Sequence, residues 1–232
     1  MHLPTTRRAF LQTSAAAGTL AAIPNVQAAG DDTLRIGLVG CGGRGTGAAT
    51  QALSADPNVK LVAMADAFED RLSESLATLK ADETVAAKVD VRPEGRFVGF
   101  DACDRLIASG VDVVLLCTPP GFRPQHLRAA VEAGKHVFAE KPVAVDAPGV
   151  RSVLETCALA RTKGLSVVSG LCLRYDNGFR ETVRRIHDGA VGEVVTLFAN
   201  DYRGGRWAKP KQPGWSEMTY QMRNWKQERG HR

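Results

Sequence analysis

The sequence LRIGLVGCGGRG at residues 34–45 decides the fold of this chain. Its first half is an apolar run that predicts a buried β-strand, and its second half places Gly40, Gly42 and Gly45 at the spacing G-x-G-x-x-G. The first glycine permits a tight turn, the second lets backbone N–H groups approach a pyrophosphate, and the third lets a helix pack closely on the strand. Because helix-compatible sequence follows, the stretch predicts a dinucleotide-binding turn.

The loop between the strand and this helix carries the features of an anion site. Gly43 and Arg44 complete it, and the helix that begins here directs the positive end of its dipole toward the bound phosphates. Arg44 has two interpretations at this stage. It either pairs with the pyrophosphate or is an exposed arginine at the start of the helix.

An acidic residue ends the next apolar run, VKLVAMAD at residues 59–66. Asp66 lies 21 residues beyond Gly45, where a carboxylate accepts hydrogen bonds from the adenosine ribose hydroxyls. A 2′-phosphate at this position would meet a like charge. The sequence therefore favours NAD as the cofactor, with NADP still possible.

The first 28 residues have the pattern of an export signal. Arg7 and Arg8 form a twin-arginine pair, and a weakly apolar stretch at 13–23 precedes the small-residue site that ends at Ala28. The stretch is too short and too rich in Ala, Ser, Thr and Gly to span a membrane stably. We expect a signal peptide at residues 1–28, export by the twin-arginine (Tat) route, and a periplasmic location.

Composition narrows the class of protein further. With 232 residues, 44% of them hydrophobic, the chain is long enough to bury a full core. Its five cysteines are widely spaced and lack a C-x-x-C pair, which predicts buried free thiols and neither a disulfide framework nor a metal site. The five cysteines are Cys41, Cys103, Cys117, Cys157 and Cys172.

The end of the chain is basic, because residues 200–232 hold most of the excess positive charge, with Trp207, Trp215 and Trp225 among them. A basic, tryptophan-containing segment raises the possibility of nucleic-acid binding. No nucleic-acid-binding motif accompanies it, and export would remove the protein from the cytoplasm. We therefore expect no nucleic-acid partner.

Strand-like and helix-like segments alternate along the middle of the chain. This order predicts an α/β fold with a doubly wound parallel sheet, of the Rossmann type, whose ligand-binding turns gather at the carboxyl ends of the strands. The expected strands are 34–39, 59–65, 96–98, 111–117, 136–139 and 165–171. The expected helices are 46–55, 68–80, 101–109, 124–133 and a last one that begins at 146 or 147 and ends at 163.

Two further turns fall at the same edge of the sheet, at residues 117–120 and 140–142. The sequence around them, LCTPPGFRPQHLRAAVEAGKHVFAEKP at 116–142, resembles the signature of the glucose-fructose oxidoreductase and inositol dehydrogenase (Gfo/Idh/MocA) family. The resemblance extends from residue 34 to about residue 225. The twin-arginine start and the GGRGTG form of the glycine loop resemble exported members that act on sugars.

The resemblance implies hydride transfer between NAD(P) and a carbon of a sugar or polyol substrate. It implies that Lys141, in the Glu-Lys-Pro turn, is the catalytic residue and lies beside the nicotinamide. Burial and the nicotinamide cation would both disfavour the ammonium form of this lysine. Glu140 would hold the nicotinamide ribose or orient Lys141, and Thr118 and Pro119 would contact the cofactor.

Other residues in the matched region have less specific roles. His126 lies near the start of an expected helix, where it either faces the cofactor or serves as a partly buried helix-start residue. His136 begins a strand and is interpreted as structural. Arg174 and Tyr175 follow the last expected strand and resemble residues that face the substrate where the family chain enters its second domain.

The second domain of the family is represented only by its beginning. We expect a nucleotide-binding domain at 29–172 and the truncated start of an α+β substrate domain at 173–232, with a strand at 193–199. The resemblance implies a homo-oligomer for a chain of the full family length, and the state of this chain is left open.

Three functional classes remain at this point. The first is an NAD(P)-dependent oxidoreductase acting on a sugar or polyol. The second is a glycoside hydrolase of the same family that uses bound NAD for transient oxidation. The third is a non-catalytic nucleotide-binding remnant, since the Asp and His that assist the lysine in the family have no equivalent in this sequence.

Overall fold

The computed structural model describes residues 33–200, 202 and 208–225. The chain divides into two units, residues 1–33 and 34–232, and the fold below belongs to the second unit. The signal predicted at residues 1–28 lies outside the described residues, so it stays a prediction, as does the domain boundary near residue 172.

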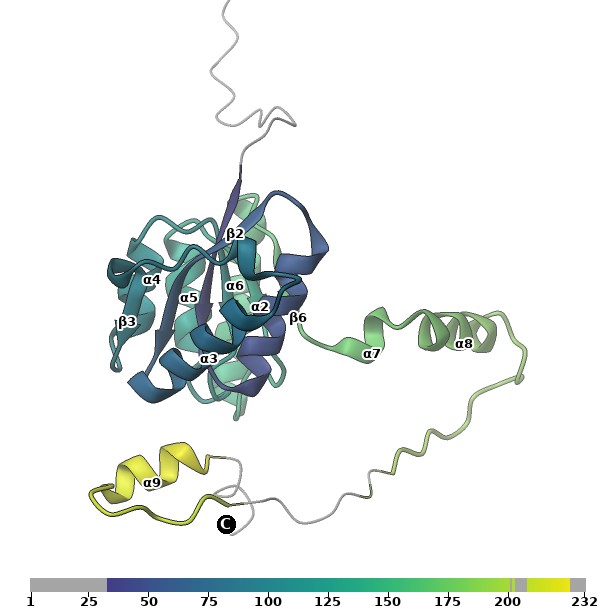
Figure 1. Cartoon of the computed structure of the whole chain (residues 1–232). Helices are drawn as coiled ribbons and strands as arrows, with labels where there is room; N and C mark the ends of the chain where they lie inside the picture. Colours follow the sequence, from purple (N-terminus) through teal and green to yellow (C-terminus); the bar gives the residue numbers. More distant parts are fainter. Residues whose placement is uncertain (1–32, 201, 203–207, 226–232) are drawn as a thin grey trace, which may run out of the picture. The chain divides into compact units, whose positions relative to one another are not determined.

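One parallel sheet of six strands forms the centre of the described part of the second unit (Figure 1). The strand order is β3-β2-β1-β4-β5-β6, and all neighbouring strands run parallel. The order reverses between β1 and β4, which creates the switch point where doubly wound folds bind ligands. This arrangement confirms the predicted α/β fold. The strands are β1 (Leu34–Val39), β2 (Val59–Asp66), β3 (Arg96–Val98), β4 (Val113–Leu116), β5 (His136–Ala139) and β6 (Val167–Ser169).

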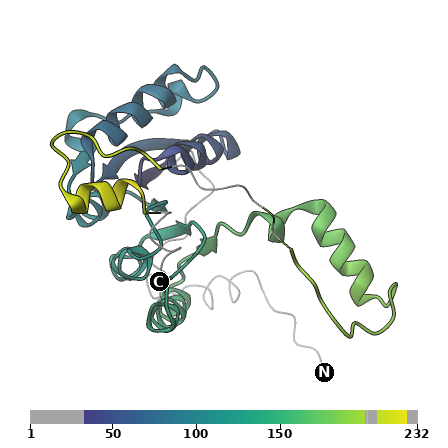
Figure 2. The same cartoon turned by 90° about the horizontal axis from the view of Figure 1, so that it is seen from below.

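Helices cover both faces of the sheet, as Figure 2 shows. Two helices, α2 (Gly43–Ala55) and α3 (Glu69–Ala81), share a buried apolar cluster with one face. The opposite face packs against α4 (Ala102–Ala108), α5 (Arg123–Glu132) and α6 (Ala147–Thr162). Short 3₁₀ turns at Ala86–Lys88 and Pro93–Gly95 lead into β3.

Strand β4 lies near the middle of the sheet and is buried on both faces. Leu115 packs with the α2 and α3 side, whereas Val114 and Leu116 pack with the α4, α5 and α6 side. A strand covered on both faces needs apolar residues at every position. This need explains the uninterrupted VVLL sequence.

Two glycines of the loop after β1 are required by the backbone itself. Gly40 has a φ of +94°, a left-handed conformation that side chains strain. Gly45 lies so close to β1 that a Cβ placed on it would be 1.9 Å from the carbonyl oxygen of Gly40. The close packing of helix α2 on the strand, predicted from the third glycine, is confirmed.

The observed elements differ from the expected ones mainly at their ends. Helix α2 begins at Gly43 instead of Thr46, because the loop glycines themselves form its first turn. The strand expected at 193–199 is wrong, because this segment is irregular and its apolar side chains Val195, Leu197 and Phe198 are exposed. A strand needs a neighbouring strand to satisfy its backbone groups, and none of the described residues after β6 is in a strand.

Short helices follow β6. They are α7 (Cys172–Tyr175), α8 (Asn177–His187) and α9 (Glu217–Arg223). No residue of α8 is buried, and Glu181 pairs with Arg184 and Arg185 along the helix surface at 2.9 and 2.8 Å.

All five cysteines are free, but Cys172 on α7 is exposed, contrary to the expectation of buried thiols. Among the described helices, none combines the length and apolar character that a membrane crossing requires.

The contact at Gly45 predicts a specific sensitivity of the fold. We expect Gly45→Ala to lower the free energy of unfolding by about 1–3 kcal/mol, because the added methyl group forces helix α2 away from β1. The matched control is Gly47→Ala in the same helix, where a Cβ meets only the Nη1 atom of Arg44 at 3.7 Å. The control should raise stability by about 0.5–1 kcal/mol. Urea unfolding followed by circular dichroism measures both, and equal effects would contradict the packing described above.

Candidate functional site

The loop after β1 leaves an open surface at the start of helix α2. A Cβ placed on Gly42 or Gly43 would meet no atom within 4 Å. Gly42 is the N-cap of α2, and no side chain caps this helix. The first turn of the helix therefore offers backbone N–H groups and positive dipole charge to an anion.

Asp66 connects this loop to the end of β2. Its Oδ2 accepts a hydrogen bond from the Cys41 backbone N–H at 2.7 Å, and its Oδ1 accepts one from the Phe68 backbone N–H at 2.9 Å. Burial raises the pKa of the Asp66 carboxyl, and the two backbone donors act against this rise. Each carboxylate oxygen accepts more than one hydrogen bond, so Asp66 still has acceptor capacity for ribose hydroxyls.

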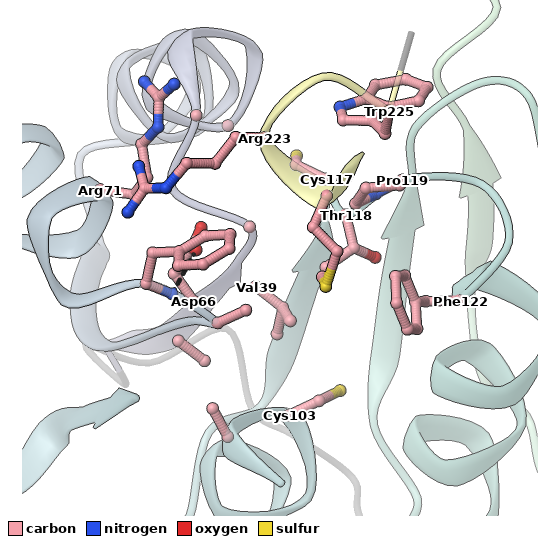
Figure 3. A pocket seen from close by; sticks show the side chains of 18 of the residues that line it. Val39, Asp66, Arg71, Cys103, Cys117, Thr118, Pro119, Phe122, Arg223 and Trp225 are labelled. Carbon is pink, nitrogen blue, oxygen red and sulfur yellow. Dashed lines mark hydrogen bonds between the residues drawn. The ribbon is translucent and has the colours of Figure 1, made fainter. Parts of the chain in front are cut away.

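A cavity of about 310 Å³ lies above these elements, at the carboxyl ends of β1, β2 and β4 (Figure 3). It brings together most of the predicted cofactor residues, which come from the glycine loop with the start of α2, the end of β2, the turn after β4, and helix α5. Of these predicted residues, the lining includes Gly40, Gly42, Gly43, Arg44, Gly45, Asp66, Thr118, Pro119 and His126.

One wall of the cavity combines a hydroxyl, an imidazole and an aromatic ring. Thr118 Oγ1 and His126 Nδ1 are 3.3 Å apart, and the His126 ring stacks on Phe122 with the ring centroids 5.8 Å apart. Burial lowers the pKa of His126, which favours the neutral imidazole. His126 is half-buried and lines the cavity, which fits both interpretations, so its role stays a prediction.

Arg123 lies buried behind this wall of the cavity. Its role was not identified from the sequence. Its guanidinium is buried and donates hydrogen bonds to the carbonyl oxygens of Leu116 and Thr118. Burial lowers the pKa of Arg123, while burial together with Glu140 raises the pKa of the neighbouring Cys117 thiol to about 12. The guanidinium thereby fixes the turn after β4, and the protonated Cys117 is a packing residue.

The Glu-Lys-Pro turn joins the glycine loop through an ion pair. Arg44 Nε lies 2.6 Å from Glu140 Oε1, and the Glu140 side chain is buried. Glu140 Oε2 also accepts a hydrogen bond from the Lys141 backbone N–H at 3.2 Å. In this structure Arg44 thus pairs with a carboxylate, and its pairing with a pyrophosphate stays a prediction.

Several predicted residues lie apart from the cavity. Glu140 and Lys141 are not among its lining residues in the described part of the chain, and the Lys141 side chain is exposed, so the expected burial is absent. Arg174 and Tyr175 are exposed on α7 and do not line the cavity either. Their catalytic and substrate roles therefore remain predictions.

The cavity also contains residues that sequence reasoning did not identify. Phe68 and Arg71 follow Asp66 closely, so their distance from the acidic residue was an available signal. The residues contributed by the end of the chain gave no such signal, because their position depends on long-range packing. Together these residues are Phe68, Arg71, Phe100, Phe122, Lys209, Met222, Arg223, Asn224 and Trp225.

The residues present fit a dinucleotide. The loop surface at Gly42 and Gly43 is open where a pyrophosphate would lie, and any side chain there would fill that space. The adjacent carboxylate of Asp66 suits a ribose, and the backbone N–H groups of α2 suit the phosphates.

Comparison with known proteins supports the same conclusion. Residues 34–170 match the model of the Gfo/Idh/MocA family, described as an oxidoreductase family with an NAD-binding Rossmann fold. The chain is 33% identical over 173 residues to inositol 2-dehydrogenase from Rhizobium meliloti, covering 73% of this chain and 46% of that protein. It is 26% identical over 190 residues to a glycosyl hydrolase family 109 protein from Streptomyces coelicolor, covering 76% and 38%.

A solved structure shares the fold. The scyllo-inositol dehydrogenase of Lactobacillus casei, determined with bound NAD(H) and scyllo-inositol, has a TM-score of 0.53 and 25% identity. The similarity covers 70% of this chain and 43% of that one. The chain thus spans somewhat less than half the length of the relatives it matches.

The burial of His126 predicts a pH-dependent stability. Because its pKa in the folded state lies below the ordinary 6.5, the unfolded chain binds the proton first as the pH falls. Folding stability should therefore decrease below about pH 6.5, with His126 contributing up to about 1.4 kcal/mol per pH unit. We expect His126→Asn to show a shallower decrease in urea unfolding between pH 7.5 and pH 5.5, about one pH unit either side of that value. His187→Asn, on the exposed face of α8, is the control, and an identical decrease in all three proteins would refute the effect.

Proposed function

Because this chain belongs to the Gfo/Idh/MocA oxidoreductase family, we propose that it provides the cofactor half of an NAD(P)-dependent polyol dehydrogenase. The enzyme would transfer a hydride between the nicotinamide and a hydroxyl-bearing carbon of a sugar or polyol. The names of its relatives, inositol 2-dehydrogenase and scyllo-inositol dehydrogenase, support cyclic polyols as the substrate class.

One observation carries the cofactor assignment. The surface at Gly42 and Gly43 is open, and it lies at the N-terminus of a 13-residue helix that no side chain caps. The carboxylate of Asp66 is held beside this surface by a hydrogen bond from the Cys41 backbone N–H. A pyrophosphate and its adjoining ribose need this pair of features side by side. Asp66 supports NAD as the preferred form, with NADP as the alternative.

The chain's own residues divide the work between binding and proton transfer. The nicotinamide, when bound, supplies the hydride acceptor or donor. Lys141 would take the hydroxyl proton at its Nζ atom as the alcohol is oxidised and return it in the reverse direction. Glu140 fixes the Lys141 backbone through its Oε2 and holds Arg44 through its Oε1, so the turn and the glycine loop are positioned together.

A second function has one observation in its favour. The similarity to a glycosyl hydrolase family 109 protein supports hydrolysis of a glycoside with transient use of bound NAD. The glycine loop and the Glu-Lys-Pro turn serve both chemistries equally. A cofactor-binding protein without turnover is the third alternative, and the assays below separate all three.

We also propose a location and a substrate approach from the sequence. Arg7 and Arg8 support export by the Tat route to the periplasm. Arg174 and Tyr175 support contacts to the substrate hydroxyls, and a protein of the relatives' full length would be a homo-oligomer.

The cofactor site is tested by adding a side chain to the open loop. Gly42→Val should weaken NAD binding by at least about tenfold, or 1.4 kcal/mol, because the isopropyl group occupies the space of the pyrophosphate. Asp66→Ala should cost about 1–3 kcal/mol of binding free energy by removing a charged acceptor. The control is Gly47→Val, in the same helix but away from the cavity. Calorimetry that shows equal affinity in all four proteins would rule out this site.

The reaction is tested in a chain that carries a complete substrate domain. With myo- or scyllo-inositol and NAD, a dehydrogenase produces a net rise in reduced-nicotinamide absorbance, whereas a glycosidase releases a chromogenic leaving group without net change. Lys141→Ala should lower kcat by about 10²–10⁴-fold and leave cofactor affinity nearly unchanged. Lys80→Ala, an exposed lysine on α3, is the control. Full activity of the Lys141→Ala protein would remove Lys141 from the mechanism.

A further inference from the structure

Residues 209–225, called here the C-terminal segment, form one side of the proposed cofactor cavity. Five of its residues line the same cavity as Gly42 and Asp66, although they are more than 140 residues away from Asp66 in the sequence. These residues are Lys209, Met222, Arg223, Asn224 and Trp225. The segment therefore contributes to the space that a dinucleotide would occupy.

The C-terminal segment is closed into a loop by a buried asparagine. Asn224 Oδ1 accepts a hydrogen bond from the Lys209 backbone N–H at 2.8 Å, and its Nδ2 donates to the Lys209 carbonyl at 3.2 Å. The same Nδ2 donates to the Tyr220 carbonyl at 3.0 Å, and Ser216 caps helix α9. The two ends of the segment are thus tied together by hydrogen bonds.

Arg223 fastens the C-terminal segment to helix α3. Its Nη1 and Nη2 atoms each lie 2.8 Å from an Asp70 carboxylate oxygen, a two-point geometry that only arginine provides. The guanidinium carbon is 4.1 Å from the centre of the Phe68 ring and 4.8 Å from that of Trp215. The Arg223 side chain is only 10% exposed, whereas Asp70 on the helix surface is 61% exposed. The pairing lowers the pKa of Asp70.

This attachment lies beside the predicted ribose site. Phe68, which stacks on Arg223, donates its backbone N–H to Asp66. Figure 3 shows Arg223 and Arg71 near Asp66 on one side of the cavity, with Thr118 and Phe122 on the other. The end of the cofactor that reaches Asp66 is the adenosine half.

We infer that Arg223 is a positioning residue for the adenosine half of the cofactor: it pairs with Asp70 and thereby holds the C-terminal segment as the outer wall of the adenosine site. The inference rests on the proposed cofactor function and adds a part of the site to it. Adenosine then binds the closed arrangement, in which the segment covers it. Binding of the nicotinamide half, which the proposed function places at the Glu-Lys-Pro turn, does not depend on Arg223.

The apparent affinity for an adenosine ligand depends on the fraction of molecules in which the C-terminal segment is closed. If loss of the Arg223–Asp70 pair reduces the closed fraction to about one tenth, the apparent Kd for an adenosine ligand rises about tenfold. Because both partners act through one contact, removing the second adds little to the loss caused by the first. A purely structural contact would instead lower the unfolding midpoint and leave ligand binding unchanged.

The experiment measures binding of two cofactor halves, AMP and nicotinamide mononucleotide, by calorimetry to the whole chain. Arg223→Gln, Asp70→Asn and the double variant should each bind AMP about tenfold more weakly, with nicotinamide mononucleotide unaffected. Asp70 is 61% exposed on the surface of α3, so its replacement leaves the core intact if Arg223→Gln fails to fold. Glu69→Gln removes a carboxylate from the same helical turn, and Lys211→Gln breaks the Lys211–Glu217 pair within the C-terminal segment. Both controls should bind AMP as the unmodified protein does.

Each outcome bears on one proposal only. Unchanged AMP affinity in Arg223→Gln and Asp70→Asn, with tight AMP binding by the unmodified protein, would overturn the role of Arg223 alone. Equal weakening in Lys211→Gln would also overturn it, because the effect would then follow any disturbance of the segment. Failure of the unmodified protein to bind either AMP or NAD would instead refute the proposed cofactor function.

Discussion

The contact between Gly45 and the carbonyl of Gly40 is the constraint on which the rest of the site depends. A Cβ placed on Gly45 would lie only 1.9 Å from the carbonyl oxygen of Gly40, so this position has room for a hydrogen atom alone. Helix α2 can therefore lie directly against the end of β1. This closeness brings the first turn of the helix to the edge of the sheet. The positive end of the helix dipole and its free N–H groups therefore face the cavity at Gly42 and Gly43.

Two carboxylates then hold the glycine loop from opposite sides. Asp66 receives the Cys41 N–H and connects the loop to β2, while Glu140 pairs with Arg44 and connects it to the turn after β5. An extended dinucleotide bound across the switch point of the sheet would reach from Asp66 at one end to the Glu140 turn at the other. The loop is therefore placed relative to both Asp66 and the predicted catalytic turn.

The middle of the site is organised by a buried charge rather than by apolar packing. Arg123 gives its hydrogen bonds to the carbonyl groups of Leu116 and Thr118, the last positions of β4 and its turn. A buried guanidinium left unpaired would be costly, so this arrangement fixes the turn that presents Thr118 to the cavity. The neutral imidazole of His126, stacked on Phe122, completes the same wall.

The sequence by itself determined the order of strands and helices, the open glycine loop and the position of Asp66. These features follow from short-range rules: continuous apolar runs for buried strands, and glycine wherever backbone approach or positive φ excludes a side chain. Only the tertiary structure decided that Arg44 pairs with Glu140, that Lys141 and Tyr175 are exposed, and that Arg223 reaches Asp70. Those contacts join residues that are far apart in the chain, and their formation depends on three-dimensional packing and charge pairing that no local pattern encodes.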